Sequence, residues 1–597
     1  MSNNDVSGKF RGLVESAEKK FARVRDLPLY STTRGQNSHN FHKVFSAYTK
    51  LWKFQQENRR ELIELGLHRW EIGEIASRIG QLYYSQYMRS SEMRFLVGAY
   101  VFYEAILSRR YFEGSEGDRG VRYKELRFYA RFLMVALLLN RVEMVDLLLE
   151  RFRGLVDEST SCFPGTSFKE WKLVLQEVIQ FNRSNSLYLN TRPLRYSLLL
   201  DSYPSSQSYV NRFHSKKVLK FRDAVLTSYH KNEVRFTEQT LDTFRMLQCL
   251  EWEPTGPIPQ KHPLELRENG GPDHSITSGI IDMKLAADMT DPNLPPNPKK
   301  AILYRPAVTQ LLAVIATICA ELPPESVMLV YLSASGNHGG TTSYVEGSGN
   351  SKRSSKLSSN SHKTNNRDTA LRGNNIQHKE LSSQNYENHL WLGPCKNGGA
   401  NFLYPDDLIP FTRRPLLLII DSDNSHAFKV LHGAERGETA ALLLSPLNPS
   451  HKNPGALDGT QNGSQFTFFL AAPLQAFCEL VGLKSSNDDL EVFDDADSII
   501  SAAFAQWEVT LCTSTSIDLA WAQFLSNPLL RRLILRFIFC RAVLTLFCLR
   551  ENGDQYLPTC IPELPEYVAP HSEVVLPSII RLANCLGVAG CFRFHGS

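Results

Sequence analysis

The stretch LLLIIDSDNS at residues 416–425 decides the fold class of this 597-residue chain. It begins with five large apolar residues and ends in a turn of carboxylates, hydroxyls and an amide. A continuous apolar run of this length, bounded by turn residues, is typical of a strand that is buried on both faces. Because such strands belong to parallel sheets covered by helices, the stretch predicts an α/β unit with a mainly parallel sheet.

Similar apolar runs flank this stretch, and helical patterns separate them. The runs predict strands at residues 195–203, 223–229, 327–333 and 439–445. The patterns predict helices at residues 237–252, at 306–321, after Ser425, and at the C-terminus over 464–483, 498–510, 516–550 and 571–586. In the first of these helices, Thr237 is expected to be the N-cap and Glu238 to place a negative charge in the first turn.

The first third of the chain has a different texture, with few Gly or Pro inside its periodic runs. The sequence RWEIGEIASRIGQLYY (residues 69–84) places its apolar residues on one helical stripe, and LRFYARFLMVALLLN (126–140) does the same. We therefore expect an all-α domain at residues 41–185, after a poorly ordered N-terminus or short helix at 1–40, and an α/β domain at 186–597.

Small and aromatic residues within the helical part have the spacing of a tetratricopeptide hairpin. Ala76, Gly80 and Tyr83 match its first helix, and Ala99 and Tyr103 resemble its second, although the loop between them is too long. Two interpretations stay open. The helices form either a concave peptide-binding groove or an ordinary bundle with small residues at its contacts.

Two polar segments do not fit a packed core. Residues 254–300 are rich in Pro, Gly and Asp, and residues 335–399 are dominated by Ser, Asn, Gly, His and Lys. Because such compositions bury too little apolar surface to offset the entropy of ordering, both are predicted to be mobile loops. The second lies between two predicted strands and carries many hydroxyls, so it is either a solvated spacer or a target of phosphorylation.

The apolar segment at residues 529–549 has the length of a membrane span. Arg531, Arg532, Arg536 and Arg541 interrupt it, and each charge near the middle of a bilayer costs at least ~2.5 kcal/mol on insertion scales. A buried amphipathic helix is the favoured interpretation, with attachment to a membrane surface as the alternative.

Composition and charge exclude several classes of protein. Lys and Arg number 66 against 62 Asp and Glu, and the formal charge of +4 is too small to indicate a basic nucleic-acid-binding surface. The 11 cysteines contain no CxxC pair, which argues against a zinc module and a disulfide framework and favours buried thiols in a reducing compartment. The first twenty residues lack an apolar core of signal-peptide length, so secretion is not expected.

The turn at residues 421–425 is the sharpest candidate for chemistry. Asp421, Asp423 and Ser425 follow a predicted parallel strand, where open α/β sheets place ligands, and alternate oxygens could hold Mg²⁺. The spacing resembles the DxDx[TV] opening of haloacid dehalogenase-like phosphatases, except that Ser425 replaces Thr or Val. It also resembles the DxSxS metal site of von Willebrand A-like domains, except that Asp423 replaces Ser. An ordinary turn whose side chains cap the next helix is the favoured interpretation.

Other motifs of catalysis or cofactor binding are incomplete. The glycine pairs after residue 338 lack the lysine and helix of a phosphate loop, and the serines at 333–336 lack the glycine of a nucleophile elbow. The sequence therefore predicts no catalytic residues, no cofactor, and no metal ligands beyond the alternative at residues 421–425.

Blocks of sequence in a constant order resemble the SCAI family, the "suppressor of cancer cell invasion" proteins. The blocks lie at residues 48–56, 69–84, 126–140, 170–178, 236–254, 321–336, 404–425 and 463–483, and they include YTKLWKFQQ and YPDDLIPFTRRPLLLIIDSDNS. They cover nearly the whole chain apart from the first forty residues, the region around residues 185–220 and the polar segments.

The resemblance implies a nuclear transcriptional cofactor that is not an enzyme. Proteins of this family are described as corepressors that bind myocardin-related transcription factors, restrain serum response factor and are linked to Rho signalling. The family is also linked to chromatin at DNA breaks, so a repair scaffold is the first alternative and a Mg²⁺-dependent phosphatase-like enzyme the second. Nuclear localisation, with a cytoplasmic pool as an alternative, and protein partners are expected. The weak candidates for binding anchors are Trp52, Trp70 and Tyr83, because aromatic residues dominate interface energies.

Overall fold

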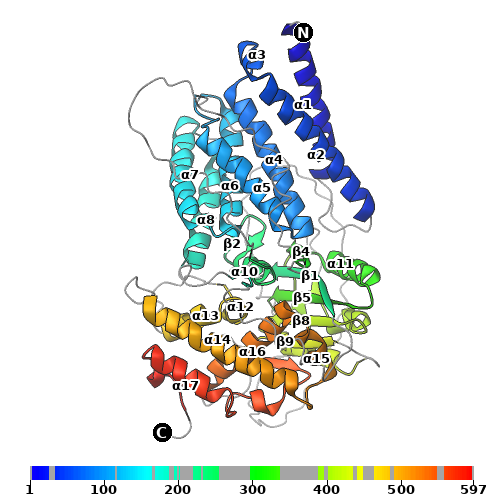
Figure 1. Cartoon of the computed structure of the whole chain (residues 1–597), viewed down its shortest axis with the longest axis vertical. Coiled ribbons are helices and arrows are strands. Elements are labelled where there is room, and N and C mark those ends of the chain that lie inside the picture. The colour runs from blue at the N-terminus through cyan, green and yellow to red at the C-terminus, as the bar shows by residue number, and fades with distance from the viewer. Residues whose placement is uncertain are drawn as a thin grey trace, which may run out of the picture.

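The computed structural model describes most of the chain. The described residues are 3–25, 34–114, 117–164, 168–186, 194–197, 201, 219–229, 233–253, 296–335, 388–394, 401–434, 440–447, 463–483, 490–547 and 557–594. The blue N-terminal helices and the red C-terminal helix lie at opposite ends of the molecule (Figure 1).

The N-terminal part is a stack of helices whose neighbours pack in pairs, α1 on α2, α4 on α5 and α6 on α7 (Figure 1). The helices are α1 (Asn3–Arg25), α2 (Arg34–Glu57), α3 (Arg59–Glu64), α4 (Arg69–Ser90), α5 (Met93–Ser108), α6 (Arg119–Leu138), α7 (Val142–Cys162) and α8 (Phe168–Ser186).

Of the two alternatives for residues 1–40, a poorly ordered N-terminus or a short helix, the described residues show helix, and α1 is longer than a short helix. Most of that segment is helical, and α1 buries Val6, Phe10, Ala17, Phe21 and Val24. These residues recur at helical spacing and form one narrow stripe on an otherwise polar helix, which is why the segment resembles a solvated tail in sequence.

The second part is built on a six-stranded sheet with the order β10-β9-β8-β5-β1-β4. All neighbouring strands are parallel except for β10, which is antiparallel to β9. The strands are β1 (Lys220–Tyr229), β4 (Lys299–Tyr304), β5 (Ser326–Ala334), β8 (Leu416–Asp421), β9 (Ala440–Leu444) and β10 (Thr559–Ile561). The α/β fold class with a mainly parallel sheet is thus confirmed.

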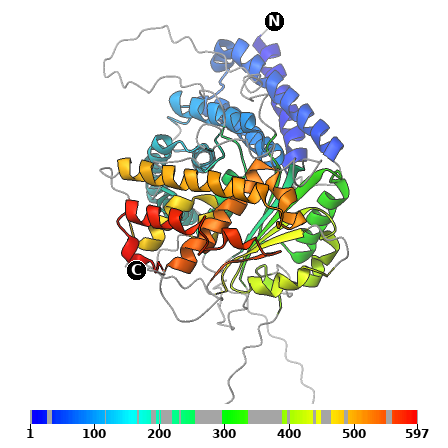
Figure 2. The same ribbon diagram turned by 60° about the horizontal axis from the view of Figure 1, so that its bottom comes forward.

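Helices cover both faces of the sheet (Figure 2). On one face α11 (Val308–Glu321) and the 3-10 helix η3 (Ser425–Leu431) bury apolar side chains against the strands. On the other face lie α10 (Leu241–Cys249), α12 (Gln465–Ala471) and α16 (Pro528–Leu546). The remaining C-terminal helices are α13 (Pro473–Val481), α14 (Leu490–Thr513), α15 (Leu519–Leu525) and α17 (Leu576–Cys585).

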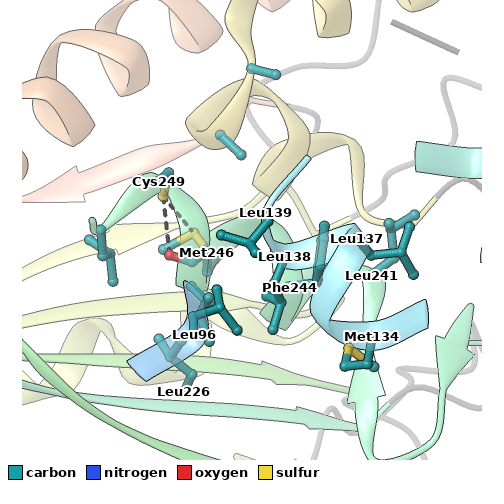
Figure 3. Packing of buried hydrophobic residues seen from close by; sticks show 14 of the residues in the cluster. Leu96, Met134, Leu137, Leu138, Leu139, Leu226, Leu241, Phe244, Met246 and Cys249 are labelled. Carbon is teal, nitrogen blue, oxygen red and sulfur yellow. Dashed lines mark hydrogen bonds between the residues drawn. The ribbon is translucent and has the colours of Figure 1, made fainter. Parts of the chain in front are cut away.

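The hydrophobic core of the second face is continuous with that of the N-terminal helices. Figure 3 shows Leu96 of α5 and Leu138 of α6 beside Leu226 of β1 and Phe244 of α10. Both parts of the chain therefore share buried apolar surface. The predicted division at residues 185 and 186 stays a prediction, because it borders residues 187–193, which lie outside the described part of the chain.

Short elements complete the fold. Two antiparallel hairpins are formed by β2 (Arg235–Phe236) with β3 (Gln239–Thr240) and by β6 (Leu390–Trp391) with β7 (Phe402–Leu403). The further 3-10 helices are η1 (Pro405–Asp407), η2 (Ile409–Phe411), η6 (Glu566–Val568) and η7 (Ala589–Cys591).

Several predicted boundaries need correction. Strand β4 begins at Lys299 and β6 at Leu390, inside the segments predicted as loops at 254–300 and 335–399. Helix α10 begins after Thr240, and Thr237 instead has a positive φ of 59° between β2 and β3. In the segment predicted as a strand at 195–203, Tyr196 forms a single parallel bridge with Trp252, and residues 198–200 and 202–203 lie outside the described part.

Helix α16 is the element that has the length of a membrane span in sequence. Arg531, Arg532 and Arg536 are buried within the protein, where Arg531 pairs with Glu508 at 3.1 Å and Arg536 donates to the carbonyl oxygens of Leu470 and Ala471. Among the described residues, no helix is long and apolar enough to cross a membrane.

Candidate functional site

The carboxyl edge of the sheet is the place where this architecture can present a ligand site. Numbered along the chain, the five parallel strands have the order 2-1-3-4-5, so the direction of winding reverses between β1 and β5. In open α/β sheets, ligands bind beyond the carboxyl ends of the strands at this reversal point. The strands β1, β5 and β8 end there, and the predicted turn at residues 421–425 follows β8.

A polar row crosses this edge. Ser228 of β1 is in register with Ser333 of β5, which is in register with Asp421 of β8. Residues in register share one face of the sheet, and all three are buried. The hydroxyls of Ser228 and Ser333 have no hydrogen-bond partner among the described residues. Sequence reasoning missed Ser228 and considered Ser333 only as part of an incomplete nucleophile elbow, because a single Ser at the end of an apolar run carries no distinctive signal.

The carboxylate of Asp421 belongs to a buried chain of hydrogen bonds. Thr467 of α12 donates its hydroxyl hydrogen to Oδ2 of Asp421 at 2.6 Å, and its Oγ1 lies 2.8 Å from Oη of Tyr331. Since the Thr467 hydrogen is already used, the phenol of Tyr331 is the donor in the second bond. Burial raises the pKa of Tyr331 well above its ordinary value, and the charges of Asp421 and Asp242 add to the effect.

Ser333 also acts on this phenol. The hydroxyls of Thr467 and Ser333 act against burial and lower the pKa of Tyr331. Tyr331 therefore stays a neutral hydrogen-bond donor over the whole physiological pH range.

The other residues of the turn form hydrogen bonds through hydroxyl and amide groups. The Ser422 amide donates to Oγ of Ser445 at 2.9 Å, and that hydroxyl donates to the Ser422 carbonyl at 3.0 Å. The hydroxyl of Ser425 donates to the Ser445 carbonyl at 2.6 Å, and the side-chain amide of Asn424 donates to the His389 carbonyl at 2.9 Å. The turn thus ties the end of β8 to the end of β9 and to the start of β6.

The three residues of the alternative metal site face different surroundings. Asp421 is hydrogen-bonded to α12, Ser425 to the backbone after β9, and Asp423 is exposed at the surface. Within the described ranges, no group of three or more His, Cys, Asp or Glu side chains is placed to hold a metal ion. The residues form a turn between β8 and η3, but Asn424 at the N-cap of η3 makes no side-chain cap hydrogen bond, so the expected capping is not found there. Metal binding stays an untested alternative.

The candidate binding anchors lie in the helical part. Trp52 and Tyr83 are 2% and 4% exposed and pack on the same ring of Phe102, with centroids 5.5 and 5.8 Å away. Trp70 is only half-buried, and the ammonium of Lys124 lies 4.3 Å from its ring centroid. Packing accounts for the first two residues, so Trp70 is the one of the three that a partner can reach without rearrangement. Their role in binding stays a prediction.

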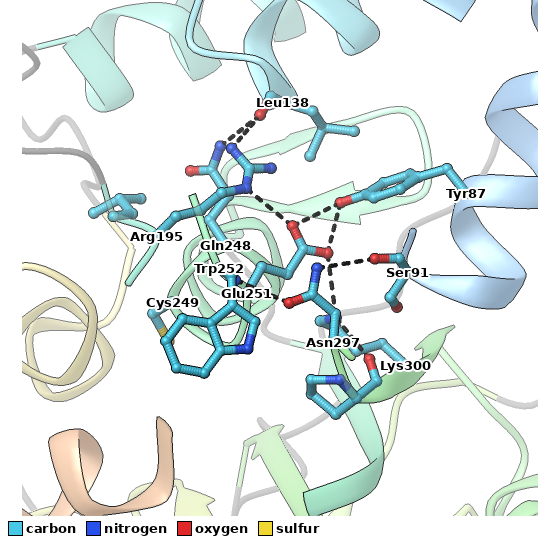
Figure 4. Close-up of polar contacts among 12 residues, drawn as sticks. Tyr87, Ser91, Leu138, Arg195, Gln248, Cys249, Glu251, Trp252, Asn297 and Lys300 are labelled. Carbon is cyan, nitrogen blue, oxygen red and sulfur yellow. Dashed lines mark hydrogen bonds and ion pairs between the residues drawn. The ribbon is translucent and has the colours of Figure 1, made fainter. Parts of the chain in front are cut away.

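A buried ionic cluster joins the helical part to the sheet (Figure 4). Its centre is the fully buried Glu251, which follows α10. The carboxylate lies 3.0 Å from Nε of Arg195 and 3.2 Å from Nζ of Lys300 on β4, and it accepts a 2.8 Å hydrogen bond from Oη of Tyr87 on α4. Burial lowers the pKa of Lys300, whereas Glu251 acts in the opposite direction.

Backbone contacts extend this cluster to α6 and to the end of α4. Nη1 of Arg195 and the side-chain amide of Gln248 both donate to the Leu138 carbonyl, at 2.7 and 3.1 Å. The side chain of Asn297 accepts from the Trp252 amide and donates to the Ser91 carbonyl. Sequence reasoning missed the cluster, because its members are spread over more than 200 residues of chain.

Comparison with known proteins identifies the family. The family model described as "Protein SCAI" matches residues 12–550. The chain belongs to the SCAI family. It is 35% identical to human "Protein SCAI" over 589 residues, which covers 97% of this chain and 88% of the human protein, and 34% identical to the mouse protein over the same shares.

A more distant SCAI relative extends the comparison beyond animals. The "Protein SCAI homolog" of Dictyostelium discoideum is 28% identical and covers 98% of this chain and 91% of its own length. No solved structure matches the chain. The family match spans most of the helical stack, the five parallel strands and α16, so it extends over both parts of the molecule and the ionic cluster that joins them.

Proposed function

We propose that the chain is a nuclear, protein-binding transcriptional cofactor. In this proposal it acts as a corepressor that restrains transcription by myocardin-related factors with serum response factor, and it is linked to Rho signalling and cell migration. The observation that supports the proposal is the match to SCAI proteins over 97% of this chain, which leaves neither part of the molecule outside the family.

The structure is compatible with a binding role. The helical stack presents a large surface on regular helices, and the polar side chains at the carboxyl edge are engaged mainly with one another and with the backbone. The continuous core and the Glu251 cluster hold the stack against the sheet, so a partner bound to one part meets a firmly supported surface.

A reporter assay tests corepression. The chain is fused to a heterologous DNA-binding domain and tethered upstream of a promoter driven by serum response factor, and output is compared with that of the DNA-binding domain alone. The proposal predicts lower output, together with nuclear accumulation of the fusion. Unchanged output at matched expression would reject corepression.

The two alternatives have separate tests. A chromatin scaffold in DNA break repair shares every sequence feature with a corepressor, so recruitment of the chain to induced breaks without any effect on the reporter would favour it. A phosphatase-like enzyme requires Asp421. Phosphate release from a generic substrate that needs Mg²⁺ and is abolished by Asp421→Asn would favour that alternative, and activity that survives Asp421→Asn would reject it.

A further inference from the structure

A band of basic side chains runs along the line where α4 meets α6. Lys124, Arg127 and Arg131 stand three and four residues apart, so they share one face of α6. Arg78 of α4 lies within electrostatic range of Arg131, and the two helices pack against each other. We call these four residues the basic stripe.

Acidic neighbours neutralise only part of this charge. Glu74 of α4 contacts two members of the basic stripe, Lys124 at 2.5 Å and Arg78 at 3.5 Å. Arg127 and Arg131 form no ion pair with a carboxylate in the described part of the chain, and the groups that favour the charged form of Arg131 are Tyr103 and, more weakly, Glu74. The four cations and Glu74 together carry a formal charge of +3, and Glu18 of α1, which lies near Tyr48 with Arg78 and Glu74, reduces this excess at the Arg78 end.

The guanidinium groups of Arg78, Arg127 and Arg131 lie close enough to repel one another. Burial lowers the pKa of Arg131, Tyr103 acts in the opposite direction, and the nearby charges of Arg78 and Arg127 add to the lowering. Like charges held together on adjacent helices destabilise one another, and a bound anion removes that cost. Arg78 has structural partners in Glu74 and in the ring of Phe21, whose centroid lies 5.3 Å from its Cζ, so Arg127 and Arg131 are the guanidinium groups that packing does not explain.

An unused hydrogen-bond donor lies at the same place. A Cβ on Gly80 of α4 would stand 2.8 Å from Cζ of Tyr103, so the phenol end of that α5 side chain passes over the glycine. It reaches the vicinity of Arg131 and Phe128 on α6. The Tyr103 side chain is completely buried, and its hydroxyl has no hydrogen-bond partner among the described residues. Because this hydroxyl is completely buried, a carboxylate bound at the surface does not reach it, and docking depends on the cations of the basic stripe.

We propose that the basic stripe is a docking surface for an acidic segment of a partner protein. Carboxylates of the segment pair with Arg127 and Arg131, and its chain continues past Lys124 toward the half-buried ring of Trp70. The inference rests on the proposed function, because it assumes that the chain works by binding proteins.

The size of the basic stripe favours a peptide over a nucleic acid. From Lys124 to Arg131 the helix rises only about 10 Å, which is the length of three extended residues. Nucleic-acid binding relies on a larger basic surface, and the whole chain has a formal charge of only +4.

Peptide binding to the full-length chain tests the proposal. The probe is a fluorescein-labelled peptide with six consecutive glutamates, and the same peptide with glutamines is its neutral control. Binding is followed by fluorescence polarisation for the wild type and for Arg127→Glu/Arg131→Glu. The matched control is Arg153→Glu/Lys172→Glu, which makes the same change in net charge at exposed positions of α7 and α8.

The expected result is that the stripe variant binds the glutamate peptide about tenfold or more weakly, whereas the control variant stays within about twofold of the wild type. Equal loss in both variants, or binding that the stripe variant retains, would overturn the proposal. The proposal would also be overturned if duplex DNA displaced the labelled peptide at a lower concentration than the unlabelled peptide does, and if DNA binding were lost in the stripe variant. Repression by the tethered wild type without peptide binding would reject the basic stripe and leave the cofactor proposal standing.

Discussion

Gly80 lies where a methyl group has no room. A Cβ at this position would stand 2.6 Å from Cε1 of Tyr103, whereas one at Gly154 of α7 would meet nothing within 4 Å. The small-and-aromatic spacing in the sequence therefore reflects direct helix contacts. Gly98 makes a similar contact with the ring of Tyr83, at 2.8 Å from Cδ1. These contacts fit both the repeat and the bundle interpretations, and the choice between them stays open.

Substitution of these glycines should have opposite effects. We expect Gly80→Ala to lower the free energy of unfolding by about 1–3 kcal/mol, because a packed core must shift to admit the methyl group. Gly154→Ala should raise it by about 0.5–1 kcal/mol, because alanine loses less backbone entropy in an exposed helix. Urea unfolding followed by circular dichroism measures both. Equal effects of the two substitutions would contradict the packing.

A single histidine should make the protein sensitive to acid. Burial lowers the pKa of His426 to about 4, with the charge of Lys429 acting in the same direction. The unfolded chain takes up this proton near pH 6.5 but the folded chain only near pH 4. Between these values the unfolded state binds more protons, so stability is lost as the pH falls from about 6.5 to about 4.

His426→Gln should therefore reduce this loss. The urea midpoint of the variant should fall less than that of the wild type between pH 6.5 and pH 4, and the exposed His42→Gln serves as the control. Parallel curves for wild type and His426→Gln would show that the histidine does not titrate in this way.

At the scale of elements, the sequence predicts the central strands and misses the edges of other elements. β5, β8 and β9 are continuous apolar runs, and the period and length of such runs are legible without tertiary information. β4 begins with two lysines after a polar segment and resembles the end of a loop. Lys300 is nevertheless buried, because Glu251 lies 3.2 Å from it after a separation of 49 residues that no local pattern reveals.

The N-cap of α10 lies three residues later than the sequence predicts. Both Thr237 and Thr240 precede an apolar run and are suitable N-caps in sequence. In the structure Oγ1 of Thr240 accepts from the Thr243 amide at 3.3 Å, and Thr237 occupies the tight turn between β2 and β3.

Substitutions at the two threonines distinguish these roles. Thr240→Ala should lower the free energy of unfolding by about 1 kcal/mol through loss of the cap. Thr237→Gly should raise it by up to about 1 kcal/mol, because glycine adopts the positive φ of 59° without strain. Thermal unfolding of the two variants measures these changes in stability. A larger loss of stability for Thr237→Gly than for Thr240→Ala would support Thr237 as the N-cap of α10.

At the scale of the whole molecule, one buried carboxylate connects the helical stack, α10 and the sheet. Glu251 faces two cations and a phenol, all of which are buried. Breaking a buried ion pair is costly, because the partners keep their charge without compensation. The site as a whole could not be predicted from sequence, since Tyr87, Arg195, Glu251 and Lys300 come from four separate segments. The turn at residues 421–425 could be predicted, because its residues are adjacent in the sequence.

Glu251→Gln should lower the free energy of unfolding by about 3–5 kcal/mol. Glu177→Gln, which breaks the half-exposed pair with Arg235, should cost less than about 1 kcal/mol. Adding Lys300→Met to Glu251→Gln should recover part of the loss by removing one uncompensated charge. Denaturant unfolding of the three variants measures these differences, and a cost for Glu251→Gln no greater than that for Glu177→Gln would contradict a central role for the cluster.

The claim that the chain is a nuclear protein-binding cofactor is tested most directly by quantitative affinity purification from nuclei. The tagged full-length chain and the tag alone are expressed at matched levels, and bound proteins are identified by mass spectrometry. The proposed function predicts specific enrichment of transcription factors of the myocardin-related type or of their cofactors. Enrichment of DNA repair proteins alone, or no enrichment over the tag, would contradict it.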